Sequence, residues 1–274
     1  MSTPTTRRPR ALVTGASSGI GQAFADRLAH DGYNLIIVAR RRDRLESLAE
    51  QLQSHYHVNV EVIIADLSKS DDLLAVEKRI AGDPALELLI NNAGFGGYMP
   101  FIELDPDKAA ELIHLKVLAV TRLARAALPG MIARGQGAII NVSSRLAFSG
   151  SMGSSQLPKR ATYAGANAFI NTFSQLLQSE LEGTGVQVQV LCPGVVSTEF
   201  HEQVGIDPNR YPTAIVMKPE DVVQASLAGL KLGEVICVPA LEDLGLLAQI
   251  QEDEKRFFEL TRSGILAGRY RALK

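Results

Sequence analysis

Short runs of apolar residues alternate along this chain with longer segments in which apolar residues recur at helical spacing. A near-continuous apolar run is typical of a parallel strand that is covered on both faces of its sheet. Alternation of such runs with helical segments indicates right-handed βαβ units. The sequence therefore predicts an α/β fold: a Rossmann-type doubly wound, parallel, seven-stranded sheet with helices on both faces, in a single domain. The predicted strands are Ala11–Val13, Leu35–Val38, Val60–Ile64, Leu86–Ile90, Ala138–Val142, Val186–Leu191 and Val235–Val238.

Three segments between these runs have the length and pattern of long helices, namely Asp43–His55, Pro106–Arg134 and Thr162–Glu182. Two other stretches, Arg145–Arg160 and Val195–Met217, fit neither a helix nor a strand, because glycine and serine interrupt the first and prolines interrupt the second. Long irregular segments in a compact domain are usually functional lids or disordered. Both stretches are therefore candidates to border a binding site.

The two ends of the chain differ from its middle. Residues 1–9 are polar and contain arginines and prolines, and we expect a disordered lead-in there. Residues 10–274 have the length of one large α/β domain, with residues 241–274 as a C-terminal helical extension. Within the extension, Leu241–Arg262 carries an apolar stripe that could cover a substrate entrance or pack against a second subunit.

Composition narrows the possible partners and location. The chain has 274 residues, 46% of them hydrophobic, and its 28 basic and 30 acidic side chains nearly cancel, which argues against nucleic acid as a partner. No apolar run reaches the roughly 18 residues that span a membrane, and the N-terminus lacks the apolar stretch of a secretory signal. The two cysteines, Cys192 and Cys237, give no metal-ligand spacing. We expect a cytoplasmic protein without a metal site.

A glycine-rich turn follows the first predicted strand. Its spacing, Gly15-x-x-x-Gly19-x-Gly21, allows a tight turn and lets the backbone approach a pyrophosphate at a helix N-terminus. With Asn91-Asn92-Ala93-Gly94, Ser144, Tyr163 and Pro193-Gly194, this turn resembles the short-chain dehydrogenase/reductase family. The resemblance implies that residues 10–274 form an NAD(P)-binding domain that transfers hydride between a nicotinamide cofactor and a carbonyl or alcohol.

The end of the second predicted strand selects the cofactor. An acidic residue there would bind the ribose 2′-hydroxyl of NAD, whereas this chain has Ala39 followed by three arginines. A guanidinium pairs with a 2′-phosphate, so NADP is favoured over NAD and Arg40 is the preferred contact, unless the arginines form only a solvated basic cluster. The predicted cofactor-binding residues are Gly15, Ser17, Ser18, Gly19, Ile20, Gly21, Arg40, Arg41, Asp66, Leu67, Asn92, Ala93, Gly94, Lys116, Tyr163, Pro193, Gly194, Val196 and Thr198.

The catalytic residues that the resemblance implies contain one mismatch. Tyr163 matches the acid/base and Ser144 the carbonyl-binding serine, but Asn167 stands where the family has lysine. The family's helix asparagine corresponds to Lys116, and ketoreductase domains of modular polyketide synthases are similar in showing this exchange. A cation about 4 Å away, at an effective dielectric near 20, stabilises a phenolate by about 4 kcal/mol. We therefore predict a tetrad of Lys116, Ser144, Tyr163 and Asn167.

Two alternatives to this tetrad remain open. Lys116 could be a helix-surface charge in a protein that has lost its activity, which would make the chain a non-catalytic NADP-binding regulatory or scaffold protein. Lys159, in the neighbouring irregular stretch, is a weaker candidate to supply the missing charge.

Apolar residues follow several of the predicted strands. In an open α/β sheet these loops gather at the carboxyl ends of the strands, where ligands bind. We therefore predict a hydrophobic ketone, aldehyde or secondary alcohol as substrate, with acyl-carrier or acyl-CoA thioesters as a further possibility. A homodimer or homotetramer through the two long helices is implied by the resemblance alone. The apolar residues are Phe95, Tyr98, Met99, Phe101, Leu146, Phe148, Phe200, Ile206, Tyr211 and Ile215.

Overall fold

The computed structural model describes residues 8–96, 99–153, 157, 159–200 and 211–271. The expected lead-in, apart from residues 8 and 9, lies outside the described residues, as do two of the apolar candidates, Tyr98 and Ile206.

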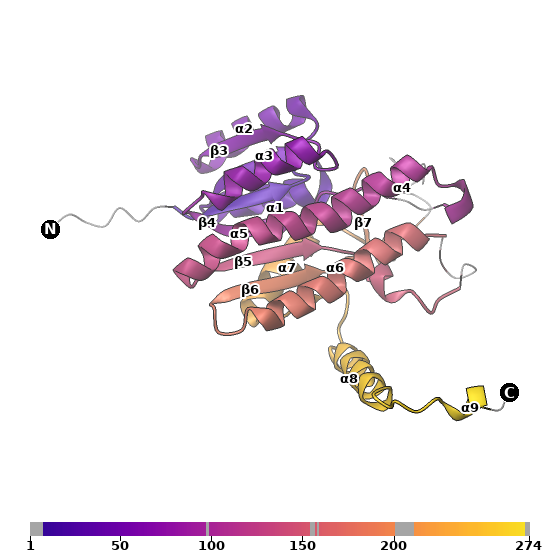
Figure 1. Cartoon of the computed structure of the whole chain (residues 1–274). Helices are drawn as coiled ribbons and strands as arrows, with labels where there is room; N and C mark the ends of the chain where they lie inside the picture. The colour runs from indigo at the N-terminus through magenta and orange to yellow at the C-terminus, as the bar shows by residue number, and fades with distance from the viewer. Residues whose placement is uncertain (1–7, 97–98, 154–156, 158, 201–210, 272–274) are drawn as a thin grey trace. The chain divides into compact units, whose positions relative to one another are not determined.

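Seven parallel strands form one sheet in the order β3-β2-β1-β4-β5-β6-β9, which confirms the predicted doubly wound architecture (Figure 1). The order reverses between the neighbouring strands β1 and β4, and this reversal is the point where α/β sheets of this kind bind ligands. The strands are β1 (Arg10–Thr14), β2 (Asn34–Ala39), β3 (Val60–Ile64), β4 (Leu86–Asn91), β5 (Gly137–Val142), β6 (Val186–Leu191) and β9 (Ile236–Cys237).

Helices bury an apolar stripe against each face of this sheet, so the strands have apolar residues on both sides. One face is covered by α1 (Gly19–His30), α2 (Arg42–Tyr56) and α7 (Pro219–Leu232). The other face is covered by α3 (Ser70–Ala81), α5 (Val120–Arg134) and α6 (Ala161–Glu180).

The long helix predicted at Pro106–Arg134 is interrupted. It begins as α4 (Pro106–Ile113), where the Asp105 carboxylate accepts from the Asp107 and Lys108 amides, and it passes through the π-helical turn η2 (His114–Ala119) before α5. Side-chain periodicity does not show this interruption, because apolar residues continue through it. A π-helical turn widens the helix locally and is frequent at functional sites, and this one contains Lys116.

The two stretches that the sequence left irregular contain short elements. In the first, the helical turn η3 (Arg145–Phe148) is held by the Arg160 guanidinium, which donates to the Ser149 hydroxyl over 2.9 Å. In the second, β7 (Val195–Val196) pairs with β8 (Val216–Met217), and the turn η6 (Thr213–Ile215) precedes β8. Strands of two residues are too short to leave a periodic pattern in the sequence. The turn η1 (Phe101–Glu103) lies between β4 and α4.

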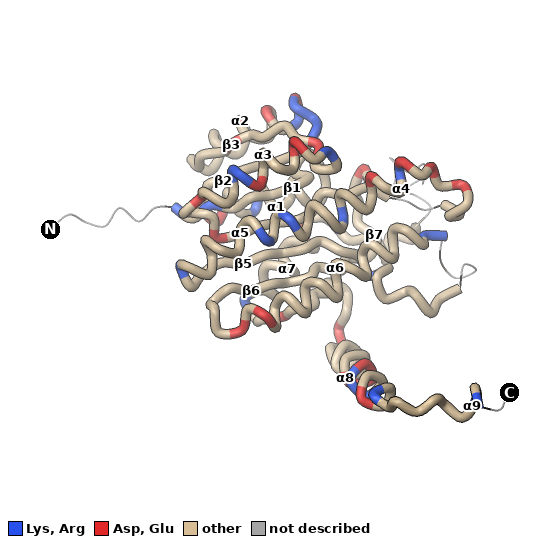
Figure 2. Tube along the Cα trace, in the orientation of Figure 1, with Lys and Arg blue, Asp and Glu red and all other residues tan. Residues whose placement is uncertain are grey.

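Residues 240–274 form a compact unit of their own, separate from residues 1–239. This unit holds α8 (Gly245–Leu260) and α9 (Gly268–Arg271), within the extension that the sequence predicted. No residue of α8 is buried, and its apolar side chains include Phe257 and Phe258, each about two thirds exposed. Figure 2 shows basic and acidic positions interspersed along α8. Within the part of the chain that the structure describes, none of the helices combines the length and apolar character that crossing a bilayer requires.

Candidate active site

A cavity of about 280 Å³ opens at the carboxyl ends of the strands, around the point where the strand order reverses. Of the residues predicted to bind the cofactor, all but Gly21 line it, as do Ser144 and the apolar residues Phe95 and Phe200. The other lining residues were not predicted from the sequence. Each lies at the end of a strand or next to a predicted residue, and this position could have identified it. They are Val38, Ala65, Leu115, Val142 and Ser143.

Neighbouring atoms leave no space for side chains at the glycines of the turn after β1. Gly15 and Gly19 have φ angles of +68° and +57°, which favour glycine. A Cβ atom at Gly15 would lie 2.9 Å from the Ala93 Cα atom, and one at Gly21 only 2.3 Å from the Gly15 carbonyl oxygen. Gly21 therefore serves the close approach of α1 to the turn rather than the cavity wall. Helix α1 begins at Gly19 on the cavity wall, and the N-terminus of a helix is a position that favours an anion.

Three hydrogen bonds join Thr14, at the end of β1, to the residues that follow β4. The Thr14 hydroxyl accepts hydrogen bonds from the Asn92 and Ala93 amides over 2.9 and 3.0 Å. The Asn92 side chain donates to the Thr14 carbonyl over 3.0 Å. These bonds hold the two strand ends together on either side of the reversal in strand order.

The arginines after β2 have different contacts. The Arg41 guanidinium donates to the Ser17 hydroxyl from Nε over 3.1 Å and from Nη2 over 3.0 Å, and Nη2 also donates to the Ser18 hydroxyl over 2.6 Å. Arg40 donates instead to Glu111 over 3.2 Å and lies 4.0 Å from Asp66. Both arginines line the cavity, but only Arg41 is fixed against the glycine-rich turn. Figure 2 shows the basic positions gathered where α2 begins.

Asp66, at the end of β3, has a carboxylate that is held by its own loop. It accepts from the Ser68 amide over 3.0 Å and from the Ser68 hydroxyl over 2.7 Å. Partial burial raises the pKa of Asp66, but the hydrogen bonds from Ser68 and the charge of Arg40 outweigh it and keep the pKa below its ordinary value. The side chain is therefore an anionic acceptor at the cavity wall.

Tyr163 and Ser144 line the same cavity from different elements. Tyr163 lies buried in the first turn of α6, and Ser144 is the second residue after β5. The Ser143 hydroxyl donates to the Asn167 carbonyl over 3.0 Å, so it is used inside the protein. The Ser144 hydroxyl accepts from the Leu146 amide over 3.2 Å, which leaves its proton available to a bound molecule.

Lys116 is a buried cation and not a helix-surface charge. Its side chain is only 4% exposed, and its Nζ donates to the Val142 carbonyl over 3.0 Å. A Cβ atom at Gly94 would lie 2.6 Å from the Lys116 Cε atom, so this glycine makes room for the lysine. Burial lowers the pKa of Lys116 to about 8. The alternative that treats Lys116 as a surface charge is therefore wrong.

Asn167 lies behind Tyr163 and does not line the cavity. It is fully buried, and its amide donates to the Tyr163 carbonyl over 2.8 Å. Its Oδ1 atom accepts no hydrogen bond from the residues that the structure describes. Lys159 lines a different cavity, together with Phe101, Leu146 and Arg160.

Only part of the predicted apolar set borders the main cavity. Phe200 does, with its ring centroid 6.0 Å from that of Tyr163, and Phe95 does as well. The other described members do not line it: Phe101 and Leu146 line the second cavity, while Met99, Phe148, Tyr211 and Ile215 line neither. Sequence alone could not separate these groups, because all of them follow strand ends.

Comparison with known proteins bears on the family. The very-long-chain 3-oxoacyl-CoA reductase of Phaeosphaeria nodorum is 35% identical over 226 residues, which are 80% of this chain and 62% of that relative. The chain spans less than two thirds of the length of the first curated relatives it matches, and some curated relatives are named as inactive.

Two solved structures match almost the whole chain. A short-chain dehydrogenase from Sphingobium yanoikuyae in complex with NADPH is 35% identical with a TM-score of 0.89, covering 96% of this chain and 100% of its own. The bulky-bulky ketone specific alcohol dehydrogenase from Comamonas testosteroni is 32% identical with a TM-score of 0.86, covering 97% of this chain and 99% of its own. A family model described as short chain dehydrogenase matches residues 9–209, and the protein therefore belongs to the short-chain dehydrogenase family.

Proposed function

We propose that the protein is an NADP-dependent oxidoreductase that interconverts a hydrophobic ketone or aldehyde and the corresponding alcohol. The observation that carries the proposal is the buried Lys116 ammonium, held at Gly94 on the wall of the cavity that Tyr163 and Ser144 also line. No carboxylate of the described residues pairs with Lys116, and burying a charge without an ion partner costs stability, which favours a functional reason for a lysine at this position. Similarity to an NADPH complex and to a ketone-specific enzyme supports the proposal.

The residues around the cavity fit a nicotinamide dinucleotide. Gly15 lets the turn after β1 pack against Ala93 and Gly94 lets Lys116 reach the cavity wall, while α1 begins at Gly19 on the same wall, where a helix N-terminus favours a pyrophosphate. In this proposal Asp66 and Leu67 hold the adenine, and Arg41 and Arg40 bind a 2′-phosphate. The segment 92–94 lies against the adenosine ribose, and the segment 193–198 holds the nicotinamide. The contacts of Arg41 with Ser17 and Ser18 support it ahead of Arg40, which the sequence ranked first. When bound, the nicotinamide supplies or accepts the hydride.

The chain's own residues handle the proton. The Tyr163 hydroxyl donates its proton to the substrate oxygen during reduction, and the Ser144 hydroxyl donates a hydrogen bond that orients that oxygen. The Lys116 ammonium stabilises the phenolate that Tyr163 becomes. Asn167 holds the first turn of α6 through the Tyr163 carbonyl. The exchange of lysine and asparagine between the two helices stays a prediction of this scheme.

A substrate panel tests the proposal. The purified protein should oxidise NADPH in the presence of bulky apolar ketones, faster than it oxidises NADH, and Tyr163→Phe should abolish this turnover. A 3-oxoacyl-CoA belongs in the panel, because a curated relative is named for that activity. If the protein turned over only the thioester, the substrate class would be acyl-CoA thioesters and not hydrophobic ketones.

The second candidate is a non-catalytic NADP-binding regulatory or scaffold protein. This candidate is favoured by the asparagine at position 167, where the family has lysine, and by the curated relatives that are named as inactive. Binding of NADPH without turnover on any member of the panel would support this candidate.

We also propose that the protein is cytoplasmic. We further propose that it forms a homodimer or homotetramer through the long helices α5 and α6.

A further inference from the structure

Glu199 lies between two residues that line the cavity but does not line it itself. Its neighbours Thr198 and Phe200 both face the cavity. The Glu199 carboxylate accepts from Arg41 Nη1 over 2.9 Å and from Arg44 Nη1 over 2.6 and 2.8 Å. These contacts join the segment after β7 to the start of α2, and the two partners are 158 and 155 residues away in the sequence.

Arg41 is held from two sides by these contacts. Its Nε and Nη2 atoms donate to Ser17 and Ser18 of the glycine-rich turn, while Nη1 donates to Glu199. Glu199 and Arg44 stand outside the cavity lining, whereas Arg41 is part of it, so Glu199 holds an arginine that a molecule in the cavity can reach. Two guanidiniums share one carboxylate here, which leaves one positive charge uncompensated for an anion.

The segment that carries Glu199 also reaches the reacting end of the cavity. A Cβ atom at Gly19 would lie 2.9 Å from the Thr198 Cγ2 atom, so this segment crosses directly over the glycine-rich turn. One residue after Glu199, the Phe200 ring centroid lies 6.0 Å from that of Tyr163. Three consecutive residues therefore contact the arginine at one end of the cavity and the tyrosine at the other.

We propose that Glu199 is a positioning residue that couples an anion bound at Arg41 to the placement of Thr198 and Phe200 over the cofactor. The inference rests on the proposed function, because the anion is the 2′-phosphate of NADP(H). A phosphate that holds Arg41 in place also favours the contact between Arg41 and Glu199. By linkage, that contact slows release of the phosphate. NADH lacks this phosphate, so it gains little from the same contact.

The test measures release of the cofactor and needs no substrate. NADPH and NADH are each displaced by excess oxidised cofactor in a stopped-flow fluorimeter. Exposed ion pairs contribute modestly and are weakened by salt, so Glu199→Gln should release NADPH about three- to fivefold faster at low salt and NADH less than twofold faster. Arg44→Gln, which alters no cavity-lining residue, should reproduce the effect, and Glu199→Asp should restore part of the slow release.

Glu46→Gln is the matched control, because Glu46 pairs with Arg42 in the first turn of α2 and neither residue lines the cavity. It should release both cofactors at the wild-type rate, and the cofactor-free Tm of Glu199→Gln should match that of the control. Equal acceleration of NADPH and NADH, or NADPH release from Glu199→Gln at the wild-type rate, would overturn the coupling while leaving the proposed function intact. Failure of the wild-type protein to bind NADPH would instead overturn the proposed function, and the inference with it.

Discussion

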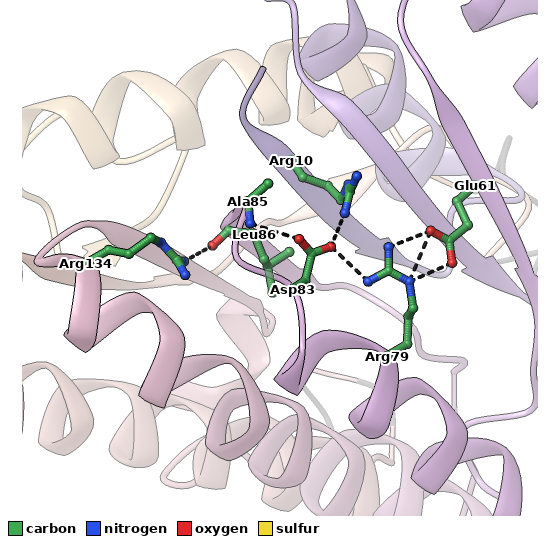
Figure 3. Close-up of polar contacts among 7 residues, drawn as sticks. All are labelled: Arg10, Glu61, Arg79, Asp83, Ala85, Leu86 and Arg134. Atoms are coloured by element: carbon green, nitrogen blue, oxygen red, sulfur yellow. Dashed lines mark hydrogen bonds and ion pairs between the residues drawn. The ribbon is translucent and has the colours of Figure 1, made fainter. Parts of the chain in front are cut away.

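At the amino ends of the strands, charged side chains satisfy one another. The Asp83 carboxylate is fully buried, accepts from the Ala85 amide over 2.9 Å and from Arg79 over 2.9 Å, and also pairs with Arg10. Arg79 in turn binds Glu61 over 2.7 Å, so the guanidinium bridges two carboxylates (Figure 3). Burial raises the pKa of Asp83, but the hydrogen bonds from Arg10, Ala85 and Arg79 outweigh it and keep the pKa below its ordinary value.

At the carboxyl ends, polar groups are buried with fewer partners. Among the described residues, the Lys116 ammonium, which can donate three hydrogen bonds, donates one, and the Asn167 Oδ1 atom accepts none. Burial lowers the pKa of Lys116 to about 8, and no carboxylate in the described part of the chain offsets this shift. The amino-end network compensates its charges and stabilises the fold, whereas the carboxyl end keeps charge available for a bound molecule at a cost in stability.

Tyr163→Phe should have the largest effect and should act on activity alone. Removing the hydroxyl removes the proton donor, and general acid catalysis contributes about 10²- to 10⁴-fold. We expect kcat to fall by about three orders of magnitude while Tm stays within a few degrees, measured by cofactor absorbance and thermal unfolding. Tyr56→Phe, which removes a tyrosine hydroxyl that donates to Asp26 outside the cavity, is the matched control and should leave kcat unchanged. Retention of kcat in Tyr163→Phe would show that its hydroxyl is not the catalytic group.

Asp83→Ala should have the opposite profile. It leaves Arg10 and Arg79 without their shared carboxylate, and breaking a buried ion pair costs about 3–5 kcal/mol. The free energy of unfolding in urea should fall by about 3 kcal/mol, with kcat unchanged at temperatures where the variant is folded. Glu61→Gln, which removes a more exposed partner of Arg79, should cost less than about 1 kcal/mol. A loss of kcat in folded Asp83→Ala would show that the two ends are coupled.

Lys116→Met should lower activity and raise stability in one change. Loss of the ammonium removes the charge that stabilises the phenolate, and we expect kcat to fall about 100-fold, which corresponds to about 2.7 kcal/mol. Replacing a buried charge with a packed apolar chain should raise the free energy of unfolding by about 1–2 kcal/mol. Unchanged kcat would contradict the exchange of Lys116 and Asn167. Lys159→Met, which alters the other cavity, is the control and should leave kcat unchanged.

The sequence predicted the parts of this site that depend on neighbouring residues. The glycine turn, the arginines after β2 and the strand ends follow from local spacing, because a parallel sheet brings its carboxyl ends together, whereas Asp66 was expected from the family resemblance. The Arg41–Glu199 contact could not be predicted, since it joins side chains 158 residues apart. The sequence also did not predict the π-helical turn at Lys116 or the two-residue strands β7 and β8. Neither changes the spacing of apolar residues enough to be detected in the sequence.

The smallest predicted effect is on the pH dependence of stability, which should depend on Lys116 at the carboxyl ends of the strands and not on Asp83 at their amino ends. The folded pKa of Lys116, about 8, lies below its ordinary value of 10.5. Between these values the unfolded chain binds more protons than the folded one, so stability from this group rises with pH. From pH 7 to pH 9 the wild-type protein should gain about 1 kcal/mol relative to Lys116→Met, measured by urea unfolding of both proteins. Asp83→Ala should gain the same stability over this pH range as the wild type, because the carboxylate that it removes is ionised at every pH in the range. Parallel pH profiles of wild type and Lys116→Met would mean that the lysine is solvated, and the contrast between the two ends of the sheet would not hold.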